Sequence, residues 1–494
     1  MLKNKKILLI TPPYHCGVVE SAGRWPNLGL LYIAGELRKT GFEPVYYDAM
    51  AKFHTMEEVV RTIKDTQPGA VVITAITATI NTALEVLKHV KKIGPDIITV
   101  LGGIHPTFCS EQILQENTDI VDFCCIGEGE HTLQELLLTV DALRCDYDKN
   151  LLQAVRGIAF MYNGQAVKTA SRPFIEDLDT LSPAWDIVNW KDYPLYFIDN
   201  SIVAIVSSSR GCTNHCAFCS QHKFWNSTYR ERDPWKFADE MELLAAEYGI
   251  NVFFIADEYP TRSRERWEKI LDILIEKNLG VHILLETCVA DIIRDADILW
   301  KYRKAGIMFV YLGVESTKDS RLEMFKKDIK FEQSRDAIKL LKTAGMITES
   351  SLIIGMPDET PGTIAETLEL AFLYGTDYMH FLFITPWPYA DMYEQLKTFI
   401  EETDFSKYNL VEPIIRSNYM TRKELMQSVL NCYKEYYSRR IPEWHAMRGD
   451  EFKKQCLLKG MKAIMENSFL KKHMHEVKSF KSGVPGPELP VSGH

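Results

Sequence analysis

The sequence predicts an α/β protein with two separate parallel sheets and a helical C-terminal region. Short apolar strands alternate with amphipathic helices over residues 1–140, a second such series fills residues 201–390, and the pattern turns helical past Pro386. Alternation of this kind is typical of parallel sheets whose strands are connected by helices. At 494 residues the chain exceeds the size of a single hydrophobic core, so we expect more than one domain.

The first series predicts a doubly wound parallel sheet. Its strands are expected at 6–10, 44–48, 70–75, 98–103 and 120–127, and its helices at 28–39, 56–66, 80–93, 107–116 and 130–140. Glycine and small polar residues follow these strands at their carboxyl ends, where open α/β sheets bind ligands. Residues 141–200 lack clear periodicity and include a segment rich in Asp, Pro and Ser, which predicts a linker on the surface.

The second series predicts a partial (β/α)6 barrel over residues 201–390. Its strands are expected at 202–207, 251–256, 281–286, 308–313, 350–355 and 379–384, and its helices at 233–248, 262–277, 293–305, 331–344 and 361–374. Barrels of this kind place their active site at the carboxyl ends of the strands. Helices expected at 422–440 and 450–467 predict a helical C-terminal domain over 391–482, and the Gly/Pro-rich tail 483–494 is expected to be disordered.

Composition narrows the class of protein. The net charge is −10, which disfavours general nucleic-acid binding. The first apolar run is too short for a signal peptide, and no apolar run is long enough for a transmembrane segment, so a cytoplasmic protein is expected. Its eleven cysteines are then expected as thiols. The basic segment from Arg422 to Lys481 is either a solvated helical face or a surface that meets an anionic substrate or a membrane.

Three cysteines, Cys212, Cys216 and Cys219, lie within eight residues on the loop after the first barrel strand. Structural zinc sites take four ligands, and the nearest candidates for a fourth are His215 and His222. A [4Fe–4S] cube held by three cysteines would keep one iron without a protein ligand, open to a small molecule. The residues favour the iron–sulfur cluster and leave zinc or structural thiols as alternatives.

The spacing Cys-x3-Cys-x2-Cys, with an aromatic residue before the third cysteine, resembles the radical S-adenosylmethionine (SAM) superfamily. That resemblance implies that the open iron binds SAM and that one electron cleaves SAM to a 5′-deoxyadenosyl radical. It also implies an electron donor such as a flavodoxin or ferredoxin. The alternative to SAM binding is a helix-capping role for the acidic pair after the second strand. The acids at the ends of the third and fourth strands would, taken alone, be ordinary polar residues. The implied SAM-binding residues are Phe218, Asp257, Glu258, Glu286, Glu315 and Gly355.

The blocks TPPY, LGGIHPTF and CIGEGEHTLQELL resemble the Rossmann-like cobalamin-binding domain of one class of radical enzymes. The frequent cobalamin motif Asp-x-His-x-x-Gly is absent, and in this class of enzymes its absence implies a cobalt without a lower histidine ligand. His105 and His131 follow strand ends and are expected to be structural histidines, with His105 the better candidate for a cobalt ligand. Without the resemblance, nucleotide binding would be an equal interpretation, although no G-x-G-x-x-G follows a strand. The implied cobalamin-binding residues are Thr11, Pro12, Gly102, Gly103, His105, Gly127, Glu128 and Gly129.

Further blocks, among them RGCTNHCAFCSQHKFW, FIADEYPT and ITPWPYADMY, resemble the anaerobic magnesium-protoporphyrin IX monomethyl ester oxidative cyclase family over nearly the whole chain. The resemblance implies cobalamin, SAM, a [4Fe–4S] cluster and a tetrapyrrole substrate, on which the fifth ring of chlorophylls is built. Phe383, Trp387 and Tyr389 then offer surfaces for stacking, or else form the core of a barrel lid. A cobalamin-dependent radical methyltransferase acting on an unactivated carbon is the alternative, and a non-catalytic cobalamin or iron–sulfur sensor is the third hypothesis.

Overall fold

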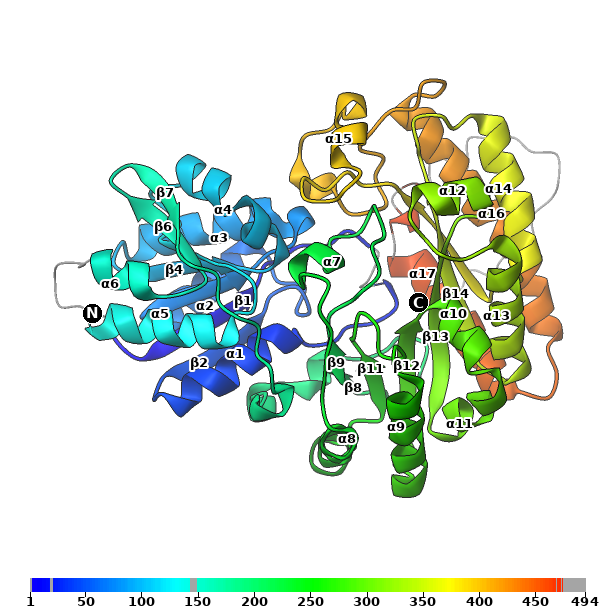
Figure 1. Ribbon diagram of the computed structural model, residues 1–494, viewed down its shortest axis with the longest axis horizontal. Coiled ribbons are helices and arrows are strands. Elements are labelled where there is room, and N and C mark those ends of the chain that lie inside the picture. The colour runs from blue at the N-terminus through cyan, green and yellow to red at the C-terminus, as the bar shows by residue number, and fades with distance from the viewer. Residues whose placement is uncertain (1, 18–20, 143–148, 468, 472, 474–494) are drawn as a thin grey trace, which may run out of the picture.

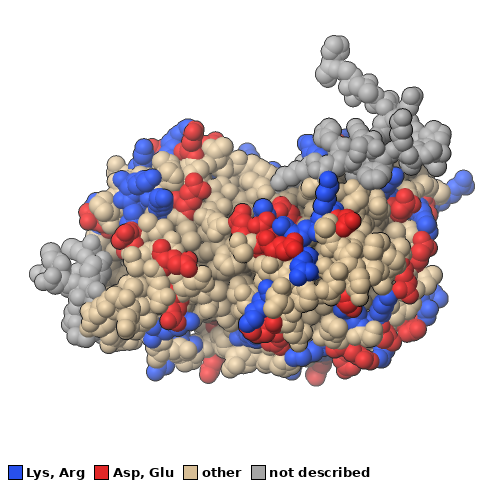
Figure 2. Space-filling model, turned by 90° about the horizontal axis from the view of Figure 1, so that it is seen from above, with Lys and Arg blue, Asp and Glu red and all other residues tan. Residues whose placement is uncertain are grey.

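Two α/β units lie side by side in the computed structural model, which describes residues 2–17, 21–142, 149–467, 469–471 and 473 (Figure 1). The first unit is drawn in blue and cyan, the second in green and yellow, and the C-terminal helices, in orange and red, pack against the second unit. On the face seen in Figure 2, acidic and basic side chains are interspersed. No helix in the described part of the chain is long and apolar enough to cross a membrane.

The first unit is built on a sheet with the strand order β2-β1-β3-β4-β5-β6-β7. Its first five strands run parallel because each is connected to the next by a helix, and they are apolar because helices cover both faces. Helices α1 and α5 cover one face, and α2, α3 and α4 cover the other. The bounds are β1 Lys6–Thr11, α1 Leu28–Lys39, β2 Glu43–Asp48, α2 Met56–Thr66, β3 Ala70–Thr74, α3 Ile80–Ile93, β4 Ile98–Gly102, α4 Ile104–Glu116, β5 Phe123–Cys125 and α5 Glu130–Ala142.

The region 141–200 differs from the predicted linker. After α6 (Lys149–Ala154), strands β6 (Ile158–Tyr162) and β7 (Gln165–Lys168) extend the first sheet as an antiparallel hairpin. Asn163 and Gly164 connect the two strands, and both have positive φ angles, 49° and 78°. Asn-Gly is a strong signal for a two-residue hairpin turn, because such turns need positive φ at both positions. The rest of this region crosses to the second unit in short helical turns.

The second unit is a partial barrel of six parallel strands in the order β15-β14-β13-β12-β11-β8. One predicted helix, 293–305, is instead two short helices, α10 and α11, separated by a turn at 296–298. The small strands β9 and β10 pair with each other and bracket the cysteine loop. The bounds are β8 Val203–Val206, β9 Ser209–Arg210, α7 Gln221–Phe224, β10 Arg230–Glu231, α8 Pro234–Tyr248, β11 Val252–Ile255, α9 Arg264–Lys277, β12 His282–Thr287, α10 Val289–Arg294, α11 Leu299–Lys304, β13 Ile307–Glu315, α12 Asp319–Met324, α13 Phe331–Thr343, β14 Ile347–Ile354, α14 Pro361–Tyr374, β15 Tyr378–Phe383 and α15 Tyr393–Leu396.

The C-terminal helices α16 (Arg422–Ala446) and α17 (Glu451–Asn467) cover the free edge of the barrel at β15. The β15 backbone N–H groups at 379 and 381 each donate to a tyrosine hydroxyl of α16, both at 3.1 Å, so the edge strand is not left unpaired. Among the basic residues of these helices, Arg440 and Lys453 pair with the buried Asp377. The expected tail 483–494 lies outside the described residues.

Candidate active site

The three cysteines occupy the loop that follows β9, at the carboxyl end of the barrel. The loop begins at Gly211, where φ is +104° and a Cβ atom would lie 2.1 Å from the backbone oxygen of Thr228. Only glycine fits a backbone in this conformation and so close to another segment. The turn at Gly211 therefore fixes where the following cysteines begin.

The thiols of the loop are largely enclosed by protein. Burial raises the pKa of Cys212 to about 12 and that of Cys219 to about 11, so thiolates there need a cationic partner such as iron. The backbone N–H of Cys219 donates to the carbonyl oxygen of Cys216 at 3.0 Å, which closes the end of the loop. A fourth thiol, that of Cys288, lies at the end of β12 and faces the loop, where it accepts a hydrogen bond from Asn214 Nδ2 at 3.5 Å. Sequence reasoning missed Cys288, which follows the third barrel strand.

The arrangement fits an iron–sulfur cube better than a single zinc ion. In the described ranges, no three His, Cys, Asp or Glu side chains converge as ligands of one ion. A cube does not require such convergence, because each of its irons takes its own thiolate. His222, a candidate fourth zinc ligand, is instead 3.6 Å from Asp391 and packs its ring against His215.

The predicted acidic pair Asp257 and Glu258 supports the cysteine loop. Asp257 is fully buried, and its carboxylate accepts from the backbone N–H of Ser208 and from the hydroxyls of Ser208 and Ser209, at 2.6–2.7 Å. Glu258 accepts from the Gly211 N–H at 3.1 Å and from another side chain, and it also lines a cavity. Both carboxylates accept hydrogen bonds from the loop, but of the two only Glu258 lines the cavity, where a ligand could reach it.

Polar side chains line the inside of the barrel. Glu286 is open to the interior space although protein surrounds it, and burial together with the charges of Glu349 and Glu258 raises its pKa to about 7. Glu315 has a positive φ of 60° and lies 3.2 Å from Lys327 Nζ. Burial alone would lower the pKa of Lys327, but nearby negative charges, chiefly the carboxylate of Glu315, together raise it by more, so the ammonium stays charged. Further inward residues that the sequence did not indicate are Tyr311, Ser351, Glu349 and His380, which form two hydrogen-bonded pairs.

An apolar cluster lies beside the cysteine loop at the mouth of the barrel. Phe218 packs edge-on against Phe325, with ring centroids 5.3 Å apart, and Met356 and Trp387 belong to the same cluster. Gly355, with φ of +94°, turns the chain at the end of β14, and its N–H donates to Glu359 at 2.6 Å. The structure thus brings Phe218 together with the β14 turn, as an adenine site would require.

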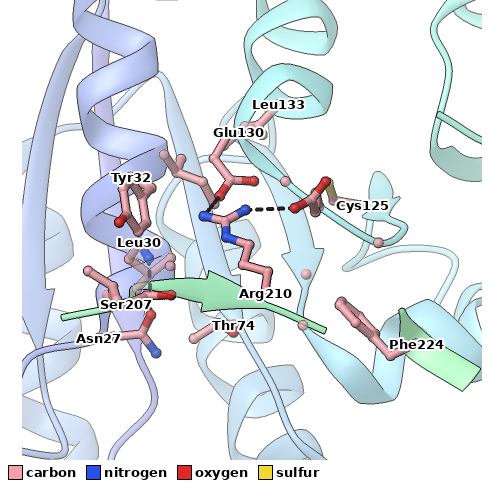
Figure 3. Close-up of a pocket in the computed structure, with 18 of the residues that line it drawn as sticks. Asn27, Leu30, Tyr32, Thr74, Cys125, Glu130, Leu133, Ser207, Arg210 and Phe224 are labelled. Atoms are coloured by element: carbon pink, nitrogen blue, oxygen red, sulfur yellow. Dashed lines mark hydrogen bonds and ion pairs between the residues drawn. The ribbon is translucent and has the colours of Figure 1, made fainter. Parts of the chain in front are cut away.

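Two cavities lie between the units at the carboxyl ends of both sheets. The first, of about 320 Å³, is the pocket drawn in Figure 3. Five predicted cobalamin residues line it: Gly102, Gly103, Gly127, Glu128 and Gly129. The second, of about 380 Å³, is lined by Thr11 and Pro12. Both cavities share part of their wall, so they lie next to each other along the domain boundary. The shared residues are Asn27, Leu28, Gly29 and Thr74.

A buried ionic cluster connects the units at the first cavity. Arg210, directly before the cysteine loop, donates from its two Nη atoms to Glu128 and Glu130, each at 2.7 Å (Figure 3). Burial works to lower the pKa of Arg210, but both carboxylates raise it on balance. Arg230 also pairs with Glu128 at 3.0 Å. The turn after β5 is therefore held to the base of the cysteine loop, a connection that sequence spacing does not reveal.

His105 and the aromatic residues expected to meet a substrate are placed differently. His105 is buried and lines neither cavity, and its Nδ1 lies 3.0 Å from Thr77 Oγ1, which in turn bonds the Tyr389 hydroxyl at 2.7 Å. Tyr389 thus joins the two units. Phe383 is buried against Gly355, and Trp387 belongs to the apolar cluster at the barrel mouth. Phe383, Trp387 and Tyr389 therefore form no exposed stacking surface in the described structure.

Comparison with known proteins finds two domain families in the chain. Residues 14–137 match the B12 binding domain and residues 206–371 match the radical SAM superfamily, which confirms the expected pair of domains. The chain is 38% identical to the anaerobic magnesium-protoporphyrin IX monomethyl ester cyclase of Rubrivivax gelatinosus, over 94% of this chain and 83% of that protein. It is 36% identical to the cyclase of the same name from Cereibacter sphaeroides, over 93% and 75%.

More distant likenesses follow the same architecture. Bacteriochlorophyllide d C-8(2)-methyltransferase of Chlorobaculum tepidum is 25% identical over 74% of this chain and 77% of its own. The solved structure of OxsB, a cobalamin-dependent SAM radical enzyme with aqua-cobalamin and SAM bound, shares the fold with a TM-score of 0.70. That match covers 97% of this chain and 73% of OxsB at 16% identity. The predicted fold class is confirmed.

Proposed function

Since the chain belongs to the anaerobic magnesium-protoporphyrin IX monomethyl ester cyclase family, we propose that it oxidises a tetrapyrrole of this kind and closes a ring on it. The chain is a radical SAM enzyme with a cobalamin-binding domain. The observation that carries the proposed substrate is the likeness to two cyclases along nearly the whole chain. The two neighbouring cavities between the units support it, because the first is lined both by the segment around the cysteine loop and by predicted cobalamin residues.

The cysteine loop is the proposed cluster site, with Cys212, Cys216 and Cys219 as its ligands. When bound, the cluster and SAM supply a 5′-deoxyadenosyl radical, which removes hydrogen from a substrate carbon. Glu258 is proposed to bind the SAM ammonium, and Phe218 with the Gly355 turn to hold the adenine. These roles are supported by the position of Glu258 in the cavity wall and by the apolar cluster beside the loop. Glu286 and Glu315 remain candidates for the other polar groups of SAM.

The first cavity is the proposed cobalamin site, because five of the expected residues line it and because the close-packed turn after β4 requires glycine. At Gly103, φ is +105° and a Cβ atom would lie 2.5 Å from the carbonyl oxygen of Ala75. The ionic cluster of Arg210 keeps the neighbouring Glu128 turn in place. A direct contact of His105 with cobalt stays a prediction, as does Asp257 in SAM binding. We also keep a flavodoxin or ferredoxin as electron donor and the cytoplasm as location, since an open cluster needs reducing surroundings.

A radical methyltransferase is the second candidate, favoured by the likeness to a methyltransferase that acts on a bacteriochlorophyllide. The test is an anaerobic assay of the reconstituted enzyme with magnesium-protoporphyrin IX monomethyl ester, SAM and a reductant, followed by mass spectrometry. The cyclase is expected to yield a product with one oxygen gained and hydrogen lost. A product heavier by one CH2 unit would instead establish methylation.

Replacing each cluster cysteine tests the proposed ligands. Cys212→Ala, Cys216→Ala and Cys219→Ala are each expected to abolish the release of 5′-deoxyadenosine under reduction, because the open iron is lost with the cluster. Cys109→Ala, on α4 of the first unit, is the matched control and is expected to release it at the wild-type rate. A loop variant that still cleaves SAM would reject the assignment.

A further inference from the structure

The second cavity has a single basic side chain in its described wall, Arg24. The segment that carries Arg24 reaches from the first unit to the inside of the barrel, where Trp25 packs against Phe254 with ring centroids 5.2 Å apart. Its backbone is fixed, because the N–H of Arg24 donates to the carbonyl oxygen of Pro194 at 3.0 Å. Arg24 is thus held at a defined place between the two units.

The guanidinium of Arg24 lacks an acidic partner in the structure. It lies over the rings of Phe53 and Tyr196, with its Cζ atom 5.3 and 6.0 Å from their centroids, and one Nη atom donates to the carbonyl oxygen of Ala51 at 2.5 Å. Its Nε–H is buried without an acceptor. Within the described ranges, no carboxylate lies within 4.0 Å of it. Arg24 lines the cavity and has no carboxylate partner there, so its guanidinium is available to an anion that enters the cavity.

The one acid in the same wall, Asp48, is not that anion. One of its carboxylate oxygens accepts from the backbone N–H of Ala51 at 3.0 Å and from the hydroxyl of Thr11. The other accepts from the hydroxyls of Tyr46 at 3.0 Å and Tyr193 at 3.1 Å. With four donors, Asp48 belongs to the internal structure of the first unit.

The basic side chain in the described wall of the first cavity, and the two buried basic residues of the C-terminal helices, already have acidic partners. Arg210, in the first cavity, is shared by two glutamates, and Arg440 and Lys453 of the C-terminal helices pair with Asp377. An anion that enters the space between the units therefore meets Arg24. The neighbouring wall is apolar and includes Met50 and Ile205, which suits a ligand with a flat apolar body and a charged edge.

We propose that Arg24 binds the free carboxylate of the substrate, an inference that rests on the proposed function. A monomethyl ester of a porphyrin with two propionic acid groups keeps one ionised carboxylate. The planar fork of an arginine matches a carboxylate in two parallel hydrogen bonds. Arg24 then determines which of the two propionate side chains lies at the second cavity, so that the esterified one is left free to react.

The test compares two ligands that differ only in this carboxylate. Magnesium-protoporphyrin IX monomethyl ester and its dimethyl ester are titrated into the reconstituted holoenzyme without reductant, and the dissociation constants are read from porphyrin fluorescence. The variants are Arg24→Gln, Arg24→Lys and the control Arg61→Gln, an exposed arginine of α2 in the same unit. Cobalamin retention is measured by absorbance for each variant, with cobinamide, which lacks the nucleotide phosphate, as a second corrinoid.

The wild-type protein is expected to bind the monoester about ten- to a hundredfold more tightly than the diester, the usual contribution of charged hydrogen bonds. Arg24→Gln should lower monoester affinity to that of the diester and leave diester binding unchanged, Arg24→Lys should keep part of the difference, and Arg61→Gln should keep all of it. Equal weakening of both ligands by Arg24→Gln, or no weakening, overturns the inference. So does a loss of cobalamin with unchanged cobinamide binding, since Arg24 would then bind the phosphate. If the wild-type protein binds neither porphyrin, the proposed function itself fails.

Discussion

Acidification is expected to weaken the contact between the two units through His105. Burial holds the pKa of His105 at about 4, well below its usual value near 6.5, because the imidazolium has no water around it. The folded protein therefore binds this proton less readily than the unfolded chain does. The stabilisation is complete above pH 6.5 and is lost as the pH falls toward 4. Protonation would also disturb the hydrogen bonds that lead from His105 through Thr77 to Tyr389.

The size of the effect follows from the two pKa values. Their difference corresponds to roughly 3 kcal/mol when the pH lies below both. Between pH 7.5 and pH 5.5, the loss attributable to this one histidine is about 1.3 kcal/mol, because protonation of the unfolded chain is nearly complete at the lower pH and that of the folded chain has barely begun.

Urea unfolding at the two pH values measures this quantity in the wild-type protein, in His105→Gln and in His445→Gln, which replaces an exposed histidine of α16. The free energy of the first unfolding transition should fall by about 1.3 kcal/mol more on acidification in the wild type and in His445→Gln than in His105→Gln. An equal fall in all three proteins would refute the reasoning, because His105 would then titrate alike in the folded and unfolded states.

Four further changes test other features of the site. Gly211→Ala should lower the iron bound per chain after reconstitution, because its Cβ would meet backbone at 2.1 Å, whereas Gly249→Ala, also at positive φ but with open space around it, should not. Arg210→Met should cost about 3 kcal/mol in the free energy of unfolding and weaken cobalamin retention, since it leaves the buried Glu130 without its cation and Glu128 with Arg230 alone. Unchanged stability would contradict that account. Tyr389→Phe should cost about 1 kcal/mol, measured by urea unfolding, through the lost bond between the units. In the wild type, the pKa of Glu286 is raised to about 7, so its ionisation is unfavourable and the free energy of unfolding should fall between pH 5 and pH 8. Glu286→Gln should remove this fall, which we expect to be about 1 kcal/mol because the side chain is open to the cavity.

Strands and helices were predictable because burial leaves a simple pattern. Each parallel strand is covered on both faces, so it reads as a short apolar run between polar turns, and most of the observed bounds lie within two residues of the predicted ones. The hairpin of β6 and β7 was missed in a segment of mixed composition, although Asn163 and Gly164 carry its turn signal. That hairpin is an edge of the sheet, where periodicity is weakest.

The candidate site was predictable only where chemistry is local in sequence. The three cysteines lie on one loop, so their spacing indicated a cluster before any fold was known. Tyr311 and Glu349, by contrast, lie inside strands, and only the three-dimensional sheet shows that they point into the barrel. Asp257 has the right position for a ligand contact, yet the serines that occupy it come from another strand. Arg24 carries no motif, and its significance depends on the absence of an acidic neighbour in the described structure.

The incomplete barrel has a consequence for the enzyme as a whole. Six strands do not close, α16 covers the β15 edge, and the segment around Trp25 of the first unit faces the opening beside β8. The cobalamin-binding unit therefore shields the barrel lumen from solvent as well as holding its own cofactor. A barrel expressed alone would admit water to the place where a carbon radical must survive. A chimera that exchanges the first unit between relatives should therefore keep the segment around Trp25, even if the exchanged unit binds cobalamin.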